Sequence, residues 1–351
     1  MKKLVFLSII LLTISCTKKT TSDKEFIRPI HDTIGFAQYD WQLDSIYNRL
    51  QLKDTPNTKN WKTVISPHDD YKYAGKLYHT SLKGVNAKTI ILIGVAHRAK
   101  NYSLQDKIIF GNYTHWKSPY GKLKVTDLNT KIQEKLSKEN FMIHDSMQAL
   151  EHSLEAIVPF LHKKNRNIEI VPILIPYINY ETMNTISTDL SQVVSEILKA
   201  NNLQFGKDVA IVISNDAVHY GTENWGRNLA PYGVDSLGTA KARNHDKRLI
   251  NDFLTGEISM NKVKNFTQET VQENDYKEYK WVWCGRYSVP FGLAFANKLN
   301  LLQNNVALTG NLLGYASSID HALIKVEDLK MGTTAIATQK HWVAYASIKY
   351  E

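Results

Sequence analysis

The hydrophobic residues of this chain fall into two patterns, short continuous runs and longer stretches in which apolar positions recur with helical spacing. The short runs are rich in β-branched residues, which is typical of strands that are buried on both faces of a sheet. Runs of this kind lie at residues 63–66, 89–95, 168–175 and 209–214. The longer stretches predict helices at residues 74–83, 127–138, 149–163, 181–200, 239–254 and 286–299.

Strands that alternate with helices predict βαβ units, in which the strands are parallel and helices cover both faces of the sheet. We therefore predict an α/β fold with a mostly parallel central sheet and helices on both faces. Three late runs, at residues 306–309, 334–338 and 342–349, predict further strands, and the alternation in the last one favours an antiparallel edge strand. Residues 115–125, with a Pro-Tyr-Gly turn in the middle, predict a hairpin.

The composition supports a folded core, because 43% of the 351 residues are hydrophobic and 10% are aromatic, which argues against a disordered chain. No linker rich in Pro, Gly or Ser interrupts the later part of the chain, so we predict a single large domain at residues 27–351. The formal net charge is +9, but the lysines are spread out rather than gathered in one stretch. This pattern indicates a solvated surface and argues against nucleic-acid binding.

The first residues have the features of a secretory signal. Two early lysines precede an apolar run at 4–12, and a small residue stands just before Cys16. The apolar run is shorter than the roughly 20 residues that span a bilayer. We predict a lipoprotein signal peptide at residues 1–16, acylation of Cys16 and a polar tether at 17–26, which together would attach the protein to a membrane of the cell envelope. A cleaved signal without lipid is the alternative.

Ionisable residues follow three of the four predicted central strands directly. His68 follows the first of these strands, His97 the second, and Asp216 with His219 the fourth. Because ligands of parallel α/β sheets bind at the carboxyl ends of the strands, we predict that these side chains share one site. The spacing of three residues would place Asp216 and His219 on the same side of a helical turn.

Two further groups precede predicted helical residues. Glu151 and His152 open one helical stretch, where the carboxylate of Glu151 interacts favourably with the helix dipole. Cys284 precedes the last helix, and a thiol at a helix N-terminus has a lowered pKa. The only other cysteine is Cys16, which is predicted to carry lipid, so Cys284 has no disulfide partner in the chain. Cys284 is interpreted either as a metal ligand or as a buried, inert thiol.

Five motifs follow one another along the chain: Ser-Pro-His-x-x-Tyr-x-Tyr-x-Gly around His68, His97 after a strand, Glu151-His152-Ser153-Leu154-Glu155, Asp216-x-x-His219-Tyr220, and Cys284-Gly285. In this order they resemble the motifs of the Memo family, which includes the MEMO-like protein B of the AmmeMemoRadiSam system. The resemblance covers about residues 60–350. Memo proteins are similar in fold to the class III extradiol dioxygenases, which are non-heme iron enzymes, so the resemblance implies a fold of that kind.

The resemblance implies that His68, His97 and Cys284 form a metal-binding triad. Two imidazoles and one thiolate leave open positions on a bound metal ion, and they favour Fe(II) or copper, with Zn(II) as a further candidate, over Mg²⁺ or Ca²⁺. A thiolate is easier to oxidise than the carboxylate that usually completes such triads. This substitution argues against ordinary ring-cleaving dioxygenase activity.

Four further residues complete the implied pocket, namely Glu151, His152, Asp216 and His219. His219 is predicted to act as a general acid or base, with Asp216 fixing its tautomer. His152 is predicted to donate a hydrogen bond to bound substrate or oxygen, and Glu151 is expected nearby.

Asp69 and Asp70 depart from the family pattern, which commonly has small residues after the first motif histidine. They add negative charge to the pocket rim, add ligands or cap a helix, and the sequence leaves these three readings open. Surface or capping roles are expected for five other histidines, His79, His144, His162, His245 and His341. Core packing or pocket walls are expected for four tryptophans, Trp61, Trp225, Trp281 and Trp283.

Two functions of different class follow from the sequence. The first is a metal-dependent oxidoreductase that acts on a small, oxidisable molecule. The second is a non-catalytic module that captures a ligand or peptide in the same pocket. The chain contains no Gly-x-Ser-x-Gly, His-Glu-x-x-His or P-loop motif that would point to another chemistry. The AmmeMemoRadiSam resemblance implies radical SAM or AMMECR1-like partners, which the sequence does not identify further.

Overall fold

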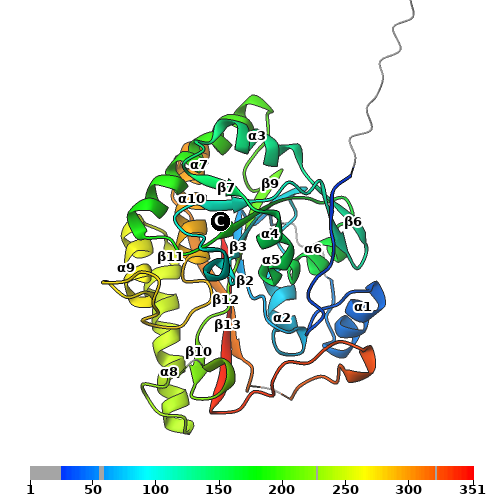
Figure 1. The fold of residues 1–351 in the computed structure, drawn as a ribbon, viewed down its shortest axis with the longest axis vertical. Helices are drawn as coiled ribbons and strands as arrows, with labels where there is room; N and C mark the ends of the chain where they lie inside the picture. Colours follow the sequence, from blue (N-terminus) through cyan, green and yellow to red (C-terminus); the bar gives the residue numbers. More distant parts are fainter. Residues whose placement is uncertain (1–24, 55–58, 227, 321) are drawn as a thin grey trace, which may run out of the picture.

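Four parallel strands form the centre of a large mixed sheet (Figure 1). Their order across the sheet is β8 (Glu169–Ile175), β3 (Thr89–Val95), β9 (Val209–Ser214) and β2 (Thr63–Ser66). β2, β3 and β9 have the predicted bounds, and β8 begins one residue later than predicted. The prediction of an α/β fold with a mostly parallel central sheet is therefore confirmed.

The structure is a computed structural model that describes residues 25–54, 59–226, 228–320 and 322–351. The predicted signal peptide, Cys16 and most of the predicted tether at 17–26 lie outside the described residues. Within those residues, no helix is both long and apolar enough to span a bilayer.

The sheet extends on both sides of the four central strands. Beyond β2 it continues, with antiparallel neighbours, through β13 (His341–Tyr350), β12 (Thr309–Ser317) and β11 (Gly256–Glu257). Beyond β8 it continues through the predicted hairpin, which is formed by β6 (Gly121–Val125) and β5 (His115–Ser118), to β1 (Ile27–Arg28). Three short strands lie off this path, β4 (Ile108–Phe110), β7 (Phe141–Ile143) and β10 (His219–Gly221).

The C-terminal strands differ from their prediction in three ways. β13 is antiparallel as predicted, but it lies between β2 and β12 and is not an edge strand. The predicted strand at 306–309 is wrong, because Asn305 ends the preceding helix with a φ of 56° and the strand starts only at Thr309. The predicted strand at 334–338 is also wrong: this segment joins no ladder of the sheet, and the Thr334 hydroxyl donates to Asp70 Oδ2 at 3.1 Å instead.

Helices cover both faces of the sheet, as predicted (Figure 1). One face is covered by α3 (Asp127–Lys135), α7 (Tyr180–Ala200), α8 (Ser236–Leu249), α9 (Met260–Thr270) and α10 (Ser288–Asn304). The other face is covered by α1 (Asp40–Arg49), α2 (Tyr71–Leu82), α4 (Asp145–Leu150), α5 (His152–Glu155) and α6 (Val158–Lys164). Successive residues of β3 alternate between the two apolar clusters, since Ile91 packs in the first and Ile90 in the second. The sheet therefore has a hydrophobic core on each side.

The helix predicted at 149–163 is divided into α4, α5 and α6. The backbone of Glu151 is extended, with φ −91° and ψ 121°, and its side chain caps α5 by accepting a hydrogen bond from the Ser153 N–H at 2.9 Å. Pro159 stands in the first turn of α6, where a missing N–H costs nothing. These breaks turn the side chain of Glu151 away from a helix surface and into the protein.

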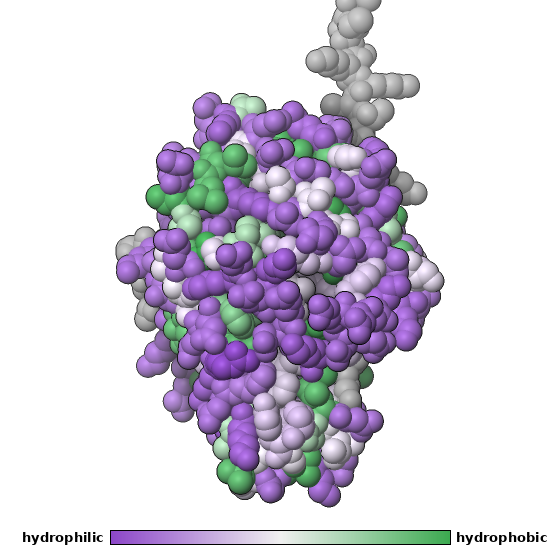
Figure 2. All heavy atoms as spheres, turned by 90° about the vertical axis from the view of Figure 1, so that its left-hand side faces the viewer, coloured by the Kyte–Doolittle hydropathy of each residue, from purple (hydrophilic) through white to green (hydrophobic). Residues whose placement is uncertain are grey.

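The remaining short elements connect the main ones. A π-helical turn at Ile250–Leu254 continues α8, and 3₁₀ turns occur at Ala99–Tyr102, Asn224–Gly226 and Glu327–Leu329. Figure 2 views the molecule from the left-hand side of Figure 1, where α8 and α9 lie, and hydrophilic residues cover most of that face. Apolar residues there occur in separate small groups, as expected for amphipathic helices that turn their apolar side to the sheet.

Candidate metal centre

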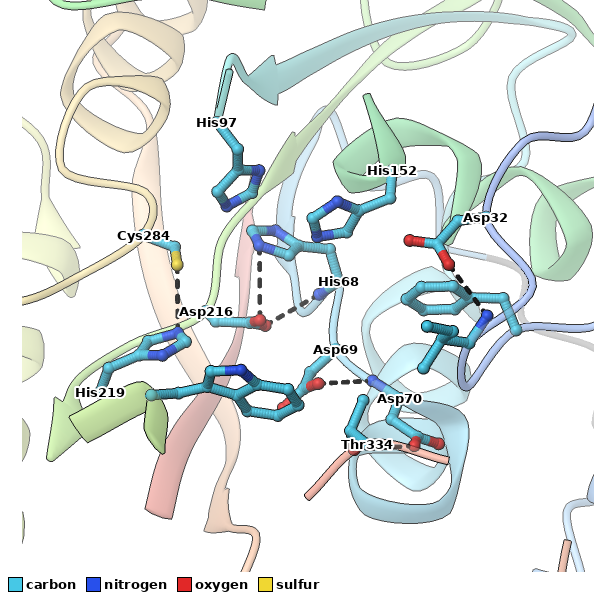
Figure 3. A pocket seen from close by; sticks show the side chains of 13 residues that line it. Asp32, His68, Asp69, Asp70, His97, His152, Asp216, His219, Cys284 and Thr334 are labelled. Carbon is cyan, nitrogen blue, oxygen red and sulfur yellow. Dashed lines mark hydrogen bonds and ion pairs between the residues drawn. The ribbon is translucent and has the colours of Figure 1, made fainter. Parts of the chain in front are cut away.

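Three polar side chains from distant parts of the chain meet at the carboxyl edge of the sheet (Figure 3). His68 follows β2, His97 follows β3, and Cys284 lies in the turn before α10. Each offers one ligand atom, and the three atoms lie within 4.8 Å of one another. His68 is 1% exposed and Cys284 is 8% exposed. Buried polar groups of this kind are costly unless a partner satisfies them, and one metal ion could satisfy all three.

The imidazole of His97 is held by Glu151. The two side chains approach within 2.8 Å, between Nδ1 and Oε1, and Glu151 Oε2 also accepts the backbone N–H of His97 at 2.8 Å. Burial opposes charge on both groups, but their mutual attraction is stronger, so it lowers the pKa of Glu151 to about 2 and raises the pKa of His97 well above its usual range. Because Nδ1 is engaged by the carboxylate, Nε2 is the ligand atom that His97 offers, and a metal ion that binds there would displace the Nε2 proton.

His68 is oriented by a different set of partners. Its Nδ1 lies 2.8 Å from Ser214 Oγ, and that hydroxyl donates its own proton to the Ser153 carbonyl, so Nδ1 is the donor. Burial lowers the pKa of His68 to about 4. The imidazole is therefore neutral at neutral pH, and its Nε2 carries a lone pair that can bind a metal ion.

Asp216 supports His68 rather than His219. Its Oδ1 accepts the backbone N–H of His68 at 2.9 Å, and its Oδ2 lies 3.4 Å from His68 Nε2. Burial, together with the charges of Asp69 and Cys284, raises the pKa of Asp216 well above its usual range. Because burial disfavours the charged form of each group, the Asp216–His68 contact is a weak polar contact rather than a strong ion pair, and at 3.4 Å it leaves Nε2 largely free.

The predicted relation between Asp216 and His219 is wrong. The chain after β9 does not form a helical turn but continues extended into β10, where His219 pairs with Val343 of β13. No hydrogen-bond partner for the Nδ1 of His219 occurs among the described residues, so Asp216 does not fix its tautomer. Instead, His219 Nε2 lies 3.1 Å from the sulfur of Cys284. His219 is thus a partner of the thiol.

The lowered pKa of Cys284 comes from neighbouring imidazoles and not from a helix. Its turn precedes α10, which begins only at Ser288, so the helix N-terminus predicted to activate the thiol lies beyond it. Burial raises the pKa of the Cys284 thiol, but His219 outweighs this effect with the help of hydrogen bonds to His68 and His97, and the pKa falls well below its usual range. These neighbours therefore favour the thiolate form of Cys284, which is the form that binds metals.

A second group with metal-binding geometry consists of His97, Glu151 and His152. The carboxylate of Glu151 already accepts three hydrogen bonds, from the ring and backbone of His97 and from the Ser153 N–H. The ring of His152 stacks on His97 with 4.6 Å between centroids and 14° between planes. His68, His97 and Cys284 consequently form the better candidate, and Glu151 orients His97 from behind.

The three candidate ligands open onto a cavity of about 290 Å³. Asp216 and His219 line it, as predicted, and so does His152, whereas Glu151 lies nearby, behind His97. Trp225 forms part of the wall, which fits the expected role of the tryptophans. Residues that the sequence reasoning missed also line the cavity, namely Asp32, Ile34, Phe36 and Thr334, because they lie in irregular segments without a recognisable pattern.

The segment that carries Asp32 is fastened by Glu155, the last residue of the third motif. Glu155 accepts the backbone N–H groups of His31 and Asp32 at 2.9 Å and 2.8 Å. It also pairs with the buried guanidinium of Arg28. The third motif therefore serves the site at both ends, since Glu151 holds His97 and Glu155 holds a wall of the cavity.

The structure also shows the roles of Asp69, Asp70 and some of the other histidines. Asp70 caps α2 by accepting the Lys72 N–H at 3.0 Å, so the capping interpretation is confirmed for this residue. Asp69 lines the cavity and accepts a hydrogen bond from the Tyr345 hydroxyl at 2.5 Å. His144 caps α4 as expected, whereas His162 and His341 are buried rather than on the surface.

Together these features define an α/β protein with a metal-capable cavity at the carboxyl edge of its parallel strands, where ligands of such sheets bind. A family model described as Memo-like protein matches residues 37–332. The chain belongs to the Memo family, and the resemblance predicted from the motifs is confirmed.

Similar curated proteins carry the same family name. A "MEMO1 family protein" of Aquifex aeolicus is 30% identical over 162 residues, which are 45% of this chain and 54% of the relative. One from Archaeoglobus fulgidus is 28% identical over 176 residues, or 49% of this chain and 60% of the relative. One from Pyrococcus abyssi is 25% identical over 283 residues, or 77% of this chain and 84% of the relative. The chain thus spans little more than half the length of the first two relatives, and the names of these relatives state no activity.

Proposed function

We propose that this Memo-family protein binds one transition-metal ion through His68, His97 and Cys284 and supports metal-dependent redox chemistry on a small molecule in the adjoining cavity. The observation that carries the proposal is the convergence of three ligand atoms within 4.8 Å, with each imidazole oriented by its other nitrogen. Metal-binding histidines are commonly oriented in this way.

The donor set favours particular metals. Two imidazole nitrogens and a thiolate suit Fe(II), copper or Zn(II) and do not suit Mg²⁺ or Ca²⁺, which prefer oxygen ligands. A bound iron or copper ion would supply electron transfer and a binding position for oxygen or substrate. The small size of the cavity, about 290 Å³, fits a small molecule rather than a folded partner.

The remaining residues of the site have separable roles. Burial and the neighbouring His97 lower the pKa of His152, so its imidazole is neutral and can donate or accept a hydrogen bond at the cavity wall. His219 contacts the sulfur of Cys284 and can take or return a proton there. Glu151 lies outside the cavity and acts by positioning His97.

Metal titration of the purified, metal-free protein under anaerobic conditions tests the metal site. We expect one equivalent of Fe(II), Cu(I) or Zn(II) to bind, and His68→Ala and Cys284→Ala each to weaken binding by at least about tenfold, because a ligand is lost. His79→Ala is the matched control, since His79 pairs with Asp54 outside the cavity. Unchanged affinity in the His68→Ala and Cys284→Ala variants would contradict the site.

Oxygen consumption with oxidisable small molecules then tests the redox chemistry. We expect consumption only by the iron- or copper-loaded protein and not by the zinc-loaded form, because zinc does not change its oxidation state. Ligand capture that persists in Cys284→Ala and after chelation, without oxygen consumption, would point instead to the non-catalytic binding module.

A further inference from the structure

The walls of the cavity are acidic, although the chain as a whole carries a net charge of +9. The lining includes the four aspartates Asp32, Asp69, Asp70 and Asp216, and no described lysine or arginine lines it. Figure 3 shows these carboxylates around the imidazoles, with Asp32 on one side and Asp69 and Asp70 on another. The carboxylates of the lining are therefore opposite in sign to the net charge of the molecule.

Two of the four carboxylates are already engaged by the protein itself. Asp70 caps α2 and lies 3.8 Å from the Lys72 ammonium. Asp216 accepts the backbone N–H of His68 and lies 3.4 Å from its Nε2. The carboxylates that remain for a ligand are mainly Asp32 and Asp69.

Asp32 and Asp69 are satisfied only by neutral donors. Asp32 Oδ1 accepts the Ile34 N–H at 2.9 Å, and Asp69 accepts the Asp70 N–H at 2.7 Å and the Tyr345 hydroxyl. Among the described residues, no cationic side chain forms an ion pair with either carboxylate. Such hydrogen bonds stabilise a carboxylate without cancelling its charge, so both leave an attractive potential for a cation.

The spacing of these carboxylates does not suit a metal ion. Within the described ranges, neither Asp32 nor Asp69 belongs to a group of ligand atoms close enough to hold one ion. Carboxylates dispersed around a cavity instead suit a molecule large enough to meet them separately. The aromatic rings of Phe36 and Trp225 also line the cavity, and aromatic faces attract organic cations.

We infer that the cavity of this protein selects a small organic cation, an amine whose ammonium group binds Asp32 or Asp69 and whose body lies against Phe36 and Trp225. The inference deepens the proposed function, on which it rests, by naming the class of substrate that would lie beside the metal ligands. An anionic substrate of the same shape is disfavoured, because the same carboxylates repel it. The cavity therefore distinguishes ligands by their charge.

Three probes of similar shape and different charge test this inference: tyramine as the cation, 4-ethylphenol as the neutral form and 4-hydroxyphenylacetate as the anion. Their affinities for the zinc-loaded and metal-free proteins are measured by calorimetry. We expect tyramine to bind at least about tenfold more tightly than the other two, as a charge-assisted hydrogen bond provides. Asp32→Asn and Asp69→Asn should each reduce this preference several-fold, whereas Asp127→Asn, a change on the exposed side of α3, should not.

Equal or tighter binding of 4-ethylphenol or 4-hydroxyphenylacetate to the zinc-loaded protein overturns the inference, as does the absence of tyramine binding at millimolar concentration. A preference that survives both Asp32→Asn and Asp69→Asn overturns it as well. Zinc uptake is measured separately, so failure of the metal site is recognised on its own. In that case the selectivity of the metal-free protein decides the inference.

Discussion

At the scale of single residues, the site depends on which atom of each side chain is already engaged. His97 and His68 both use Nδ1 for a hydrogen bond, to Glu151 and Ser214 respectively, and so both present Nε2 to the cavity. The ligand triad was implied by the family resemblance, and the strands that end before His68 and His97 predicted that these two imidazoles share one edge of the sheet. The supporting contacts could not, since Glu151 and His97 are 54 residues apart and Asp216 and His68 are 148 residues apart, and only packing brings them together.

The Glu151–His97 pair makes the stability of the protein depend on pH. The folded protein lowers the pKa of Glu151 from 4.5 to about 2, so this group stabilises the fold above pH 4.5 and loses that contribution as the pH falls toward 2. The contribution amounts to about 3 kcal/mol at most. We therefore expect the free energy of unfolding of metal-free protein to fall less steeply between pH 5 and pH 3 in Glu151→Gln than in the wild type.

Urea unfolding at several pH values measures this difference. Glu139→Gln is the matched control, because Glu139 is exposed and should leave the pH dependence unchanged. Parallel curves for Glu151→Gln and the wild type would show that the pair does not carry the effect.

At the scale of elements, the central strands were predictable because their burial on both faces leaves a continuous apolar run. The elements that were missed have weaker patterns. Only four of the eleven residues of α9 are buried, and β12 contains two glycines, which are uncommon inside strands.

The helix at 149–163 was predicted as continuous because periodicity does not reveal that Glu151 leaves the helix to hold His97. The spacing of Asp216 and His219 misled for a similar reason, since three-residue spacing has no meaning in an extended chain.

The turn that presents Cys284 is tightly packed against the segment after β9. A Cβ atom on Gly285 would lie 2.2 Å from Asn215 Oδ1, the atom that accepts the Gly285 N–H at 3.1 Å. We expect Gly285→Ala to destabilise the protein by about 1–3 kcal/mol and to weaken metal binding, because the turn and the thiolate must move. Urea unfolding and zinc titration measure the two effects.

A double-mutant cycle with Asn215→Ala separates this clash from other causes. In the Asn215→Ala background the same glycine substitution should cost less, since the amide oxygen at 2.2 Å and the amide carbon at 2.8 Å are gone and only the Cβ of residue 215, at 2.8 Å, still has to shift. Full additivity of the two substitutions would mean that Asn215 is not the obstacle.

At the scale of the whole molecule, the central strands position the imidazoles, whereas the segments near the two ends of the chain supply other walls of the cavity and further strands of the sheet. Arg28 and Glu155 fasten the segment that brings Asp32 to the cavity, and β13 completes the sheet beside β2. This arrangement depends on residues far apart in sequence, and for that reason the cavity walls were less predictable than its imidazoles.

We propose that the protein is attached to a membrane of the cell envelope through a lipid on Cys16. The proposal rests on the apolar run at 4–12 and on Cys16 itself. We expect the full-length chain, produced in bacteria, to incorporate labelled palmitate and to sediment with membranes. Cys16→Ser should abolish both properties, and Cys284→Ser should leave both unchanged. A wild-type protein that is shortened but unlabelled would instead indicate a signal cleaved without lipid.

The fastening of Asp32 by Glu155 has a practical consequence for the limits of the folding unit. The family model matches residues 37–332, yet Arg28 and Asp32 precede that stretch and Thr334 and β13 follow it. A protein trimmed to residues 37–332 would keep every motif histidine, but the Glu155 carboxylate would lose its Arg28 partner. The sheet would also lose two strands, β1 and β13. The folding unit therefore extends beyond residues 37–332 at both ends, to include at least Arg28 and β13.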